Sequence, residues 1–275
     1  MKKCILFLVL FINLNVLAQK DTEIVFSSLD TALRTPLLIK SLDLSEQNLD
    51  SLSPNVLKLI NLEKIDLGGN PKLDLSQAFH ILKGLNNLKI LWLTEAKLKS
   101  VSDSISLLVN LEEIWLDDNE LSVFPEAIKR LKKLKYLRLF SNKINSLSFK
   151  GDELQNLTYI DLCYNEFETF PVELANLKSL KRIIIWYNNI KYLPISIGQF
   201  ENIEEINLEH NDISVLPNEF SDLKSLHKLY LNGNKLTATS ITPIFQLRNL
   251  EKLDLGSNQI TVLSGKIELL EIFKI

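Results

Sequence analysis

Three stretches of the chain follow one template: LEEIWLDDNEL at 111–121, LTYIDLCYNEF at 157–167 and IEEINLEHNDI at 203–213. Each has apolar residues at its first, fourth, sixth and eleventh positions and an asparagine at its ninth. The fourth and sixth residues lie two apart, so in an extended segment they point to one side while their neighbours point to the other. One face of such a segment is therefore buried, and the other meets solvent.

The template recurs along most of the chain, in ten copies that are mostly 23 residues long. The first positions of the copies are Ile39, Leu62, Leu88, Leu111, Leu134, Leu157, Leu180, Ile203, Leu226 and Leu250. The second copy has 26 residues, and we expect its extra residues, around 71–79, to form a bulge on the outer side. Because one copy does not cover its own leucines, neighbouring copies must stack and align their extended segments as a parallel sheet. The sequence thus predicts a solenoid.

The pattern LxxLxLxxNxL resembles the signature of the leucine-rich repeat proteins, over residues 39 to about 270. The continuation LxxLPxxIxxLxxL, as in VFPEAIKRLKKL (123–134) and VLPNEFSDLKSL (215–226), is similar to the repeat subtype of Ras-suppressor-like and plant intracellular Ras-group scaffolds. The resemblance implies an α/β repeat fold, a right-handed leucine-rich repeat solenoid with a parallel concave β-sheet. Short helical, 3-10 or turn segments would occupy the convex side. It also implies a scaffold that binds proteins without catalysis.

Two polar columns accompany the apolar ones. The ninth position holds asparagine in eight copies, and a buried amide suits a turn because it both donates and accepts hydrogen bonds. These residues are Asn70, Asn119, Asn142, Asn165, Asn188, Asn211, Asn234 and Asn258. Gln47 and Ala96 replace asparagine in the first and third copies, so we expect the third repeat to be the weakest. The fifteenth position holds Pro125, Pro171, Pro194 and Pro217, with Ser53, Ser102 and Ser148 in other copies. Proline's fixed φ suits a turn out of the strand.

Residues 1–18 have the features of a bacterial-type signal peptide: Lys2 and Lys3, an apolar run, and small residues before Gln19. The run from Ile5 to Ile12 is far shorter than the roughly 20 residues of a membrane-spanning helix, which argues against an uncleaved anchor. We therefore predict an exported protein, whether secreted, periplasmic or on the cell surface; if residues 1–18 are not a signal peptide, the protein would be cytoplasmic.

We predict three parts in the chain: a signal peptide at 1–18, an N-terminal capping segment at 19–38 and the repeat array at 39–275. In the capping segment a short helix should begin near Ser27 or Ser28 and end before Pro36. The end of the array lacks an obvious polar cap. It either folds as an amphipathic last turn or leaves an edge through which copies of the chain self-associate.

The amino-acid composition argues against several classes of function. The net charge of −3 carries no basic surplus, so nucleic acid is not the expected partner. Two cysteines exclude a disulfide scaffold and a multi-cysteine zinc site, and no glycine-rich phosphate loop is present. Cys163 lies two repeats from His210, too far for a nucleophile and its base. We predict no enzyme activity, no cofactor, no metal site and no transmembrane segment in the mature chain.

Aromatic residues separate by type. Phe124, Phe167, Phe170, Phe200 and Phe220 take leucine positions, whereas tryptophans and most tyrosines take solvent-side positions of the extended segments. We expect columns that run Trp92, Trp115, Arg138, Asp161 and Tyr136, Tyr159, Arg182, Glu205, and two further columns that include Asp117, Phe140, Cys163, Trp186, Glu209 and Asp118, Ser141, Tyr164, Tyr187, His210.

Large aromatic residues with arginine are typical of binding hot spots. We therefore predict that an unidentified protein partner binds the concave face. The contact residues would be Trp92, Trp115, Tyr136, Arg138, Phe140, Tyr159, Tyr164, Arg182, Trp186 and Tyr187. Alternatives are that these rings only stabilise the sheet, that the ligand is a carbohydrate, that the protein is a cell-surface adhesin, or that it selects substrates for an enzyme complex.

Overall fold

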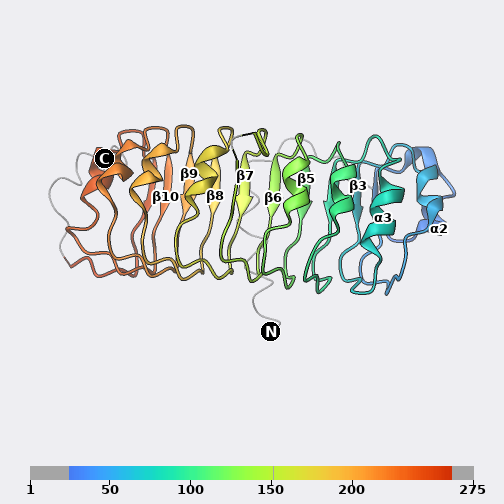
Figure 1. The fold of residues 1–275 in the computed structure, drawn as a ribbon, viewed down its shortest axis with the longest axis horizontal. Helices are drawn as coiled ribbons and strands as arrows, with labels where there is room; N and C mark the ends of the chain where they lie inside the picture. Colours follow the sequence, from blue (N-terminus) through green and yellow to red (C-terminus); the bar gives the residue numbers. More distant parts are fainter. Residues whose placement is uncertain (1–24, 151, 262–275) are drawn as a thin grey trace.

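The computed structural model describes residues 25–150 and 152–261 and has one sheet of eleven parallel strands in sequence order (Figure 1). The strands are β1 (Val25–Phe26), β2 (Ser41–Asp43), β3 (Lys64–Asp66), β4 (Ile90–Trp92), β5 (Glu113–Trp115), β6 (Tyr136–Arg138), β7 (Tyr159–Asp161), β8 (Arg182–Ile184), β9 (Glu205–Asn207), β10 (Lys228–Tyr230) and β11 (Lys252–Asp254). Each strand from β2 to β11 comes from one repeat, and every strand pairs only with its neighbours in sequence order. The predicted solenoid with a parallel sheet is confirmed.

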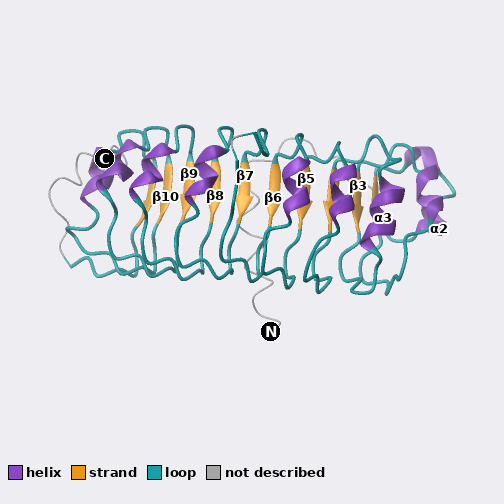
Figure 2. Ribbon diagram, viewed as in Figure 1, coloured by secondary structure: helices purple, strands orange, loops and turns teal. Residues whose placement is uncertain are grey.

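Short helices connect most of the strands on one side of the sheet (Figure 2). They are α2 (Leu29–Ala32), η1 (Pro36–Leu38), η2 (Pro54–Lys58), α3 (Leu75–Leu82), η3 (Asp103–Leu107), η4 (Glu126–Arg130), η5 (Val172–Asn176), η6 (Ile195–Gln199), η7 (Asn218–Asp222) and η8 (Thr242–Gln246), where η denotes a 3-10 helix. None of the helices in the described residues is long and apolar enough to cross a membrane.

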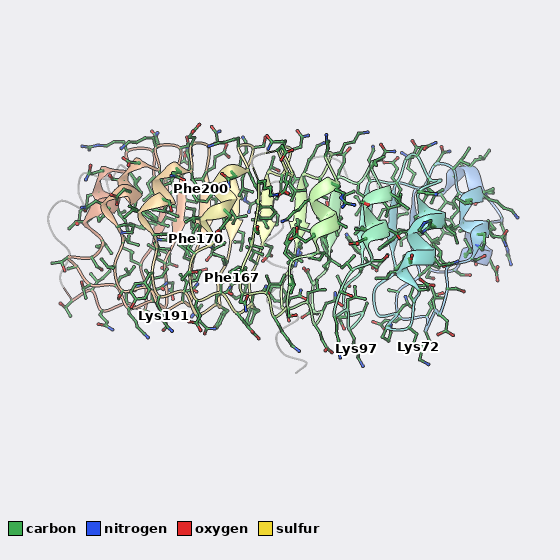
Figure 3. All side chains as sticks on the ribbon, in the orientation of Figure 1. Lys72, Lys97, Phe167, Phe170, Lys191 and Phe200 are labelled. Carbon is green, nitrogen blue, oxygen red and sulfur yellow. The ribbon has the colours of Figure 1, made fainter. Side chains whose placement is uncertain are left out.

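The core lies between the sheet and these helices. The fourth and sixth residues of each repeat point into it, as Ile160 and Leu162 do with no exposed surface. The five phenylalanines at leucine positions are buried as predicted, and Phe170 meets Phe200 of the next repeat edge to face, with ring centroids 5.9 Å apart. Figure 3 places Phe170 and Phe200 inside the stack and Lys97 and Lys191 at its margin.

The fifteenth residue of the repeat explains where the 3-10 helices begin. Pro125, Pro171, Pro194 and Pro217 each stand directly before a 3-10 helix, where a fixed φ favours the turn. Ser53 and Ser102 take the same place in their repeats. There, the serine hydroxyl accepts a hydrogen bond from a backbone N–H two residues later, so a cap replaces the proline's rigidity.

Two repeats depart from this plan. The longer second copy forms the α-helix α3 rather than a bulge, and the Asp74 carboxylate caps this helix by accepting from the backbone N–H of Gln77 at 3.0 Å. No helix separates β6 from β7 among the described residues. The buried Lys129 of the preceding helix η4 donates to the Ser148 carbonyl in this segment and pairs with Glu126 at 2.7 Å.

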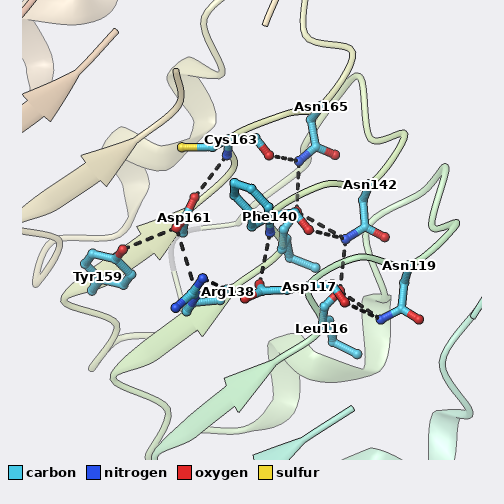
Figure 4. Close-up of polar contacts among 11 residues, drawn as sticks. Leu116, Asp117, Asn119, Arg138, Phe140, Asn142, Tyr159, Asp161, Cys163 and Asn165 are labelled. Carbon is cyan, nitrogen blue, oxygen red and sulfur yellow. Dashed lines mark hydrogen bonds and ion pairs between the residues drawn. The ribbon is translucent and has the colours of Figure 1, made fainter. Parts of the chain in front are cut away.

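The asparagine column holds adjacent repeats together. Asn165 Nδ2 donates to the carbonyls of Leu162 and Cys163 in its own repeat and of Leu139 in the repeat before, while its Oδ1 accepts from the N–H of Ile144. The other buried asparagines repeat this arrangement (Figure 4). Gln47 instead donates to the Ser27 carbonyl from an exposed position.

A second asparagine column, which the sequence analysis missed, precedes the first leucine of several repeats. Its side chains are Asn61, Asn87, Asn110, Asn156, Asn202 and Asn249, and each donates to a carbonyl of the repeat before at 2.7 to 3.0 Å.

The N-terminal end has one strand more than the ten repeats predict. Val25–Phe26, within the predicted capping segment, pairs with β2, and the helix α2 follows with Ser28 at its N-cap position. The strand forms because the apolar face of the first full repeat extends onto Phe26 and Leu29, which pack on the core. The signal peptide and the predicted C-terminal edge lie outside the described residues.

The second residue of each repeat forms a column of mostly alternating charge along the sheet. In order these residues are Lys40, Glu63, Lys89, Glu112, Lys135, Thr158, Lys181, Glu204, His227 and Glu251. Neighbours in the column pair: Lys40 with Glu63 at 2.9 Å, Glu112 with Lys135 at 2.6 Å and Lys181 with Glu204 at 2.7 Å.

Candidate functional site

The strand register brings the predicted columns together on the solvent side of the sheet, here called the sheet face. Trp92 pairs with Trp115, Trp115 with Arg138 and Arg138 with Asp161 along one column. Tyr136, Tyr159, Arg182 and Glu205 follow one another in the next. Both predicted columns are therefore present, each spanning four repeats.

A tryptophan stack occupies the first of these columns. The rings of Trp92 and Trp115 stack with centroids 4.2 Å apart and planes 16° apart. Lys64 Nζ lies 3.3 Å from the centroid of Trp92, and the Arg138 guanidinium lies 4.3 Å from that of Trp115. Both outer ring faces are thus occupied by the chain's own cations, and Lys64 is a member that the sequence analysis missed.

Arg138 is held in a buried network rather than on an open surface. Only 8% of the residue is exposed. Its guanidinium lies 2.7 Å from Asp117 Oδ2 and 4.0 Å from Asp161 Oδ2, and the Tyr159 hydroxyl also donates to Asp161 (Figure 4). Arg138, although predicted as a contact residue, therefore holds neighbouring strands of the sheet face together through buried ion pairs.

Burial dominates the electrostatics of this network. It raises the pKa of Asp117 to about 7, although Arg138 acts in the opposite direction, and the nearby Asp161 carboxylate adds to the rise. Burial likewise raises the pKa of Asp161 and of the Tyr159 hydroxyl. Two carboxylates that share one guanidinium leave an uncompensated negative charge, so a proton is retained there up to near-neutral pH.

Cys163 is buried, although the sequence places it in an outward column. The strand β7 ends at Asp161, and beyond that residue the alternation of sides no longer holds. Burial raises the pKa of the Cys163 thiol well above its ordinary value, so the thiolate is disfavoured. The geometry offers no nucleophile here.

A second group of rings, here called the open aromatic patch, consists of Phe140, Tyr164, Trp186, Tyr187 and His210. Tyr164 stacks on Tyr187 at 4.6 Å, and Tyr187 stacks on His210 at 4.3 Å, both nearly parallel. Trp186 meets Tyr164 edge to face at 5.1 Å, as does Phe140 at 5.2 Å. Tyr164 is 41% exposed and Tyr187 42%, so these rings are open to solvent.

The stacked rings stand on left-handed backbone. The eighth residue of every repeat has a positive φ, which is 51° at Tyr164, 50° at Tyr187 and 50° at His210. Gly69 and Gly233 fill this position in two other repeats. A Cβ atom on Gly233 would lie 2.6 Å from His210 Nδ1, so the imidazole covers this glycine and ends the stack. The two glycines were the sequence signal for this conformation, which the sequence analysis missed.

A metal site is absent from the described part of the chain. No group of three or more histidine, cysteine, aspartate or glutamate side chains is placed to hold a metal ion. A shallow polar depression of about 480 Å³ at the margin of the sheet includes Thr158, Lys181, Glu204 and His227 in its lining but none of the predicted contact residues.

Comparisons with known proteins agree with this architecture. An internalin, InlF of Listeria monocytogenes, superposes with a TM-score of 0.67 at 22% identity, over 85% of this chain and 71% of that one. TLR13 in its complex with ssRNA13 gives a TM-score of 0.62 at 20% identity, and the match covers 84% of this chain but 42% of TLR13. At these identities the likeness concerns the fold. No curated protein sequence matches.

Family models described as leucine rich repeat match residues 86–144 and 178–236, 156–177, and 246–264. These stretches together make up more than half of the chain, and each contains strands, 3-10 helices or asparagine turns of the solenoid. The chain therefore belongs to the leucine-rich repeat proteins.

Proposed function

We propose that this protein is a non-catalytic recognition module that binds a protein partner through the sheet face, with the open aromatic patch as the energetic centre. The observation that carries the proposal is the stack of Tyr164, Tyr187 and His210. These bulky residues occupy a backbone conformation that favours glycine, yet their rings remain at the surface. The left-handed backbone is common to all ten repeats, so these copies differ from the others in placing stacked rings at the surface, as binding hot spots do.

The leucine-rich repeat fold supports the same proposal, because stacked repeats form an extended sheet that suits recognition of large partners. We propose that residues 1–18 direct export, that 19–38 cap the array and that 39–275 form it. The repeat subtype is similar to that of Ras-suppressor-like scaffolds.

The binding test uses the mature chain to capture partners from the native source. We expect Trp186→Ala and Tyr187→Ala each to weaken binding of a captured protein by about 2 kcal/mol, as is usual for hot-spot residues. Isothermal titration with the captured protein measures this loss. Tyr192→Ala is the matched control, because Tyr192 is 63% exposed but is not one of the rings of the open aromatic patch.

Unchanged affinity in both patch variants, with their folded state intact, would remove the sheet face as the binding site. If the captured ligand is instead an oligosaccharide that depends on the same rings, the carbohydrate alternative replaces the protein partner.

Export has its own test. Amino-terminal sequencing of the protein from its native host should give Gln19 as the first residue. Chains that retain Met1 in the cytoplasmic fraction would contradict export.

A further inference from the structure

We infer that the partner of the open aromatic patch presents arginine or lysine side chains, one of whose cations rests on Trp186 beside Glu209. The inference rests on the proposed function of the sheet face and specifies the chemistry of the partner that this face accepts.

Four other rings on the sheet face already carry cations, whereas Tyr136 lies against Tyr159 with ring centroids 6.1 Å apart. Lys64 lies over Trp92, Arg138 over Trp115, Arg182 over Tyr159 at 5.1 Å, and Lys252 over Tyr230 at 5.0 Å. A cation is attracted to the face of an aromatic ring by the ring's quadrupole, most strongly with tryptophan. The sheet face thus uses one recurring contact between ring and cation, supplied within the chain at four rings.

Three rings of the open aromatic patch lack this contact in the described part of the chain. Within residues 25–150 and 152–261, no lysine or arginine lies over Phe140, Trp186 or Tyr187. These rings contact one another and His210, so their arrangement is fixed while part of their surface stays open.

Carboxylates around the patch are also without a basic partner. In the described residues, no lysine, arginine or histidine lies within 4.0 Å of the carboxylates of Asp118, Glu166 or Glu209. Carboxylates on the same repeats do have partners: Asp117 pairs with Arg138, and Asp212 with Lys235 at 2.6 Å.

Glu209 is the best placed of these carboxylates. It occupies the column position next to Trp186, and its backbone carbonyl accepts from the N–H of Tyr187 at 3.0 Å. Asn207 Nδ2 donates to Glu209 Oε2 at 2.8 Å, which orients the carboxylate. A cation over Trp186 would therefore meet a ring face and a carboxylate together, the pairing that Arg138 makes with Trp115 and Asp117.

The experiment uses two fluorescent peptides of alternating glycine and arginine or glycine and citrulline. Citrulline keeps the size and planar shape of the arginine side chain, but a carbonyl oxygen replaces one of its NH2 groups, so it has no charge. We expect the arginine peptide to bind the mature chain at least tenfold more tightly than the citrulline peptide does, as measured by fluorescence anisotropy at low salt. Trp186→Leu and Glu209→Gln should each reduce that affinity at least fivefold. Glu209→Gln keeps an acceptor for Asn207 and so tests the charge without disturbing the fold.

Glu173→Gln is the matched control, because it removes one negative charge from the helix side, in η5, and should leave binding unchanged. Equal affinity for both peptides, or equal losses from Glu209→Gln and Glu173→Gln, would overturn the inference. A partner captured through Trp186 and Tyr187 that binds Glu209→Gln as well as wild type would overturn it too, while leaving the proposed function in place. Failure of the proposed function itself would give a different result: the captured partner would bind the Trp186→Ala and Tyr187→Ala variants as tightly as the wild type.

Discussion

At the scale of single residues, the eighth position of the repeat carries a conformational cost that most copies do not avoid. A left-handed backbone costs a residue with a Cβ atom about 1 kcal/mol, whereas glycine adopts it freely. Only Gly69 and Gly233 meet that preference in the described residues. At Tyr164 and Tyr187 ring stacking offsets part of the cost, but Glu95 is exposed with a φ of 53° and makes no such contact.

Replacing Glu95 by glycine should therefore raise the free energy of unfolding, by up to about 1 kcal/mol after the greater freedom of glycine in the unfolded chain is counted. Urea denaturation measures the change. Gly233→Ala is the reverse control and should destabilise the protein, because its Cβ would collide with the His210 ring. A less stable Glu95→Gly variant would show that the left-handed conformation is not strained there.

The types of residue along the sequence predicted much of the site, and the errors of this prediction have physical causes. Alternation of sides along a strand placed Trp115, Tyr136 and Tyr159 correctly on the sheet face. It failed at Cys163, because the strand had already ended. It also gave no sign that Arg138 is buried, since burial depends on how Asp117 and Asp161 from the adjacent repeats close around the guanidinium.

At the scale of elements, three neighbouring strands share the buried network of Arg138. Asp117 follows β5, Arg138 ends β6 and Asp161 ends β7. The network also binds the backbone, because Asp117 accepts from the N–H of Phe140 and Asp161 from that of Cys163. Its protonation therefore affects how three repeats pack.

The raised pKa of Asp117 predicts that stability falls as pH increases. The unfolded carboxyl group loses its proton near pH 3.8, whereas the folded one keeps it until about pH 7. Between these values the folded state binds the extra proton, so the free energy of unfolding decreases by about 1.4 kcal/mol per pH unit, up to about 4 kcal/mol in total. Asp161, whose pKa is also raised, acts in the same direction.

Urea denaturation between pH 5 and 8 checks this prediction, and Asp117→Asn should flatten the profile because it has no proton to lose. Parallel profiles for the variant and the wild type would exclude Asp117 as the source of the dependence.

Element boundaries were less predictable than element order. The sequence located the repeats, and the prolines at the fifteenth position marked the starts of η4 to η7. The sequence predicted a bulge where the helix α3 forms. The helix depends on the cap at Asp74 and on the room that three extra residues provide, and the repeat pattern contains neither. Ser148 at the proline position gave no signal that the helix between β6 and β7 would be missing, because Ser53 and Ser102 stand at the same position before η2 and η3.

At the scale of the whole molecule, stability is shared between neighbouring repeats. Asn165 and Asn258 make equivalent sets of four hydrogen bonds, but Asn165 is buried in mid-array and Asn258 is half-exposed near the end of the described chain. Water replaces lost partners more readily at the exposed site.

We therefore expect Asn165→Ala to cost about 1 to 3 kcal/mol of unfolding free energy and Asn258→Ala less. Denaturant melts of the two variants, compared at equal pH, measure the difference. Equal losses would mean that the position of a repeat in the array does not influence what its asparagine contributes.

The charge column along the sheet bears on how such a chain changes length in evolution. Loss of one repeat, residues 111–133, would place Lys89 beside Lys135, and like charges on neighbouring strands repel. Loss of two repeats, residues 88–133, would place Glu63 beside Lys135 and restore an attractive pair. Between Lys40 and Lys135, where the charges alternate without a break, removing or adding repeats in pairs should therefore disturb the column less than a change by one repeat.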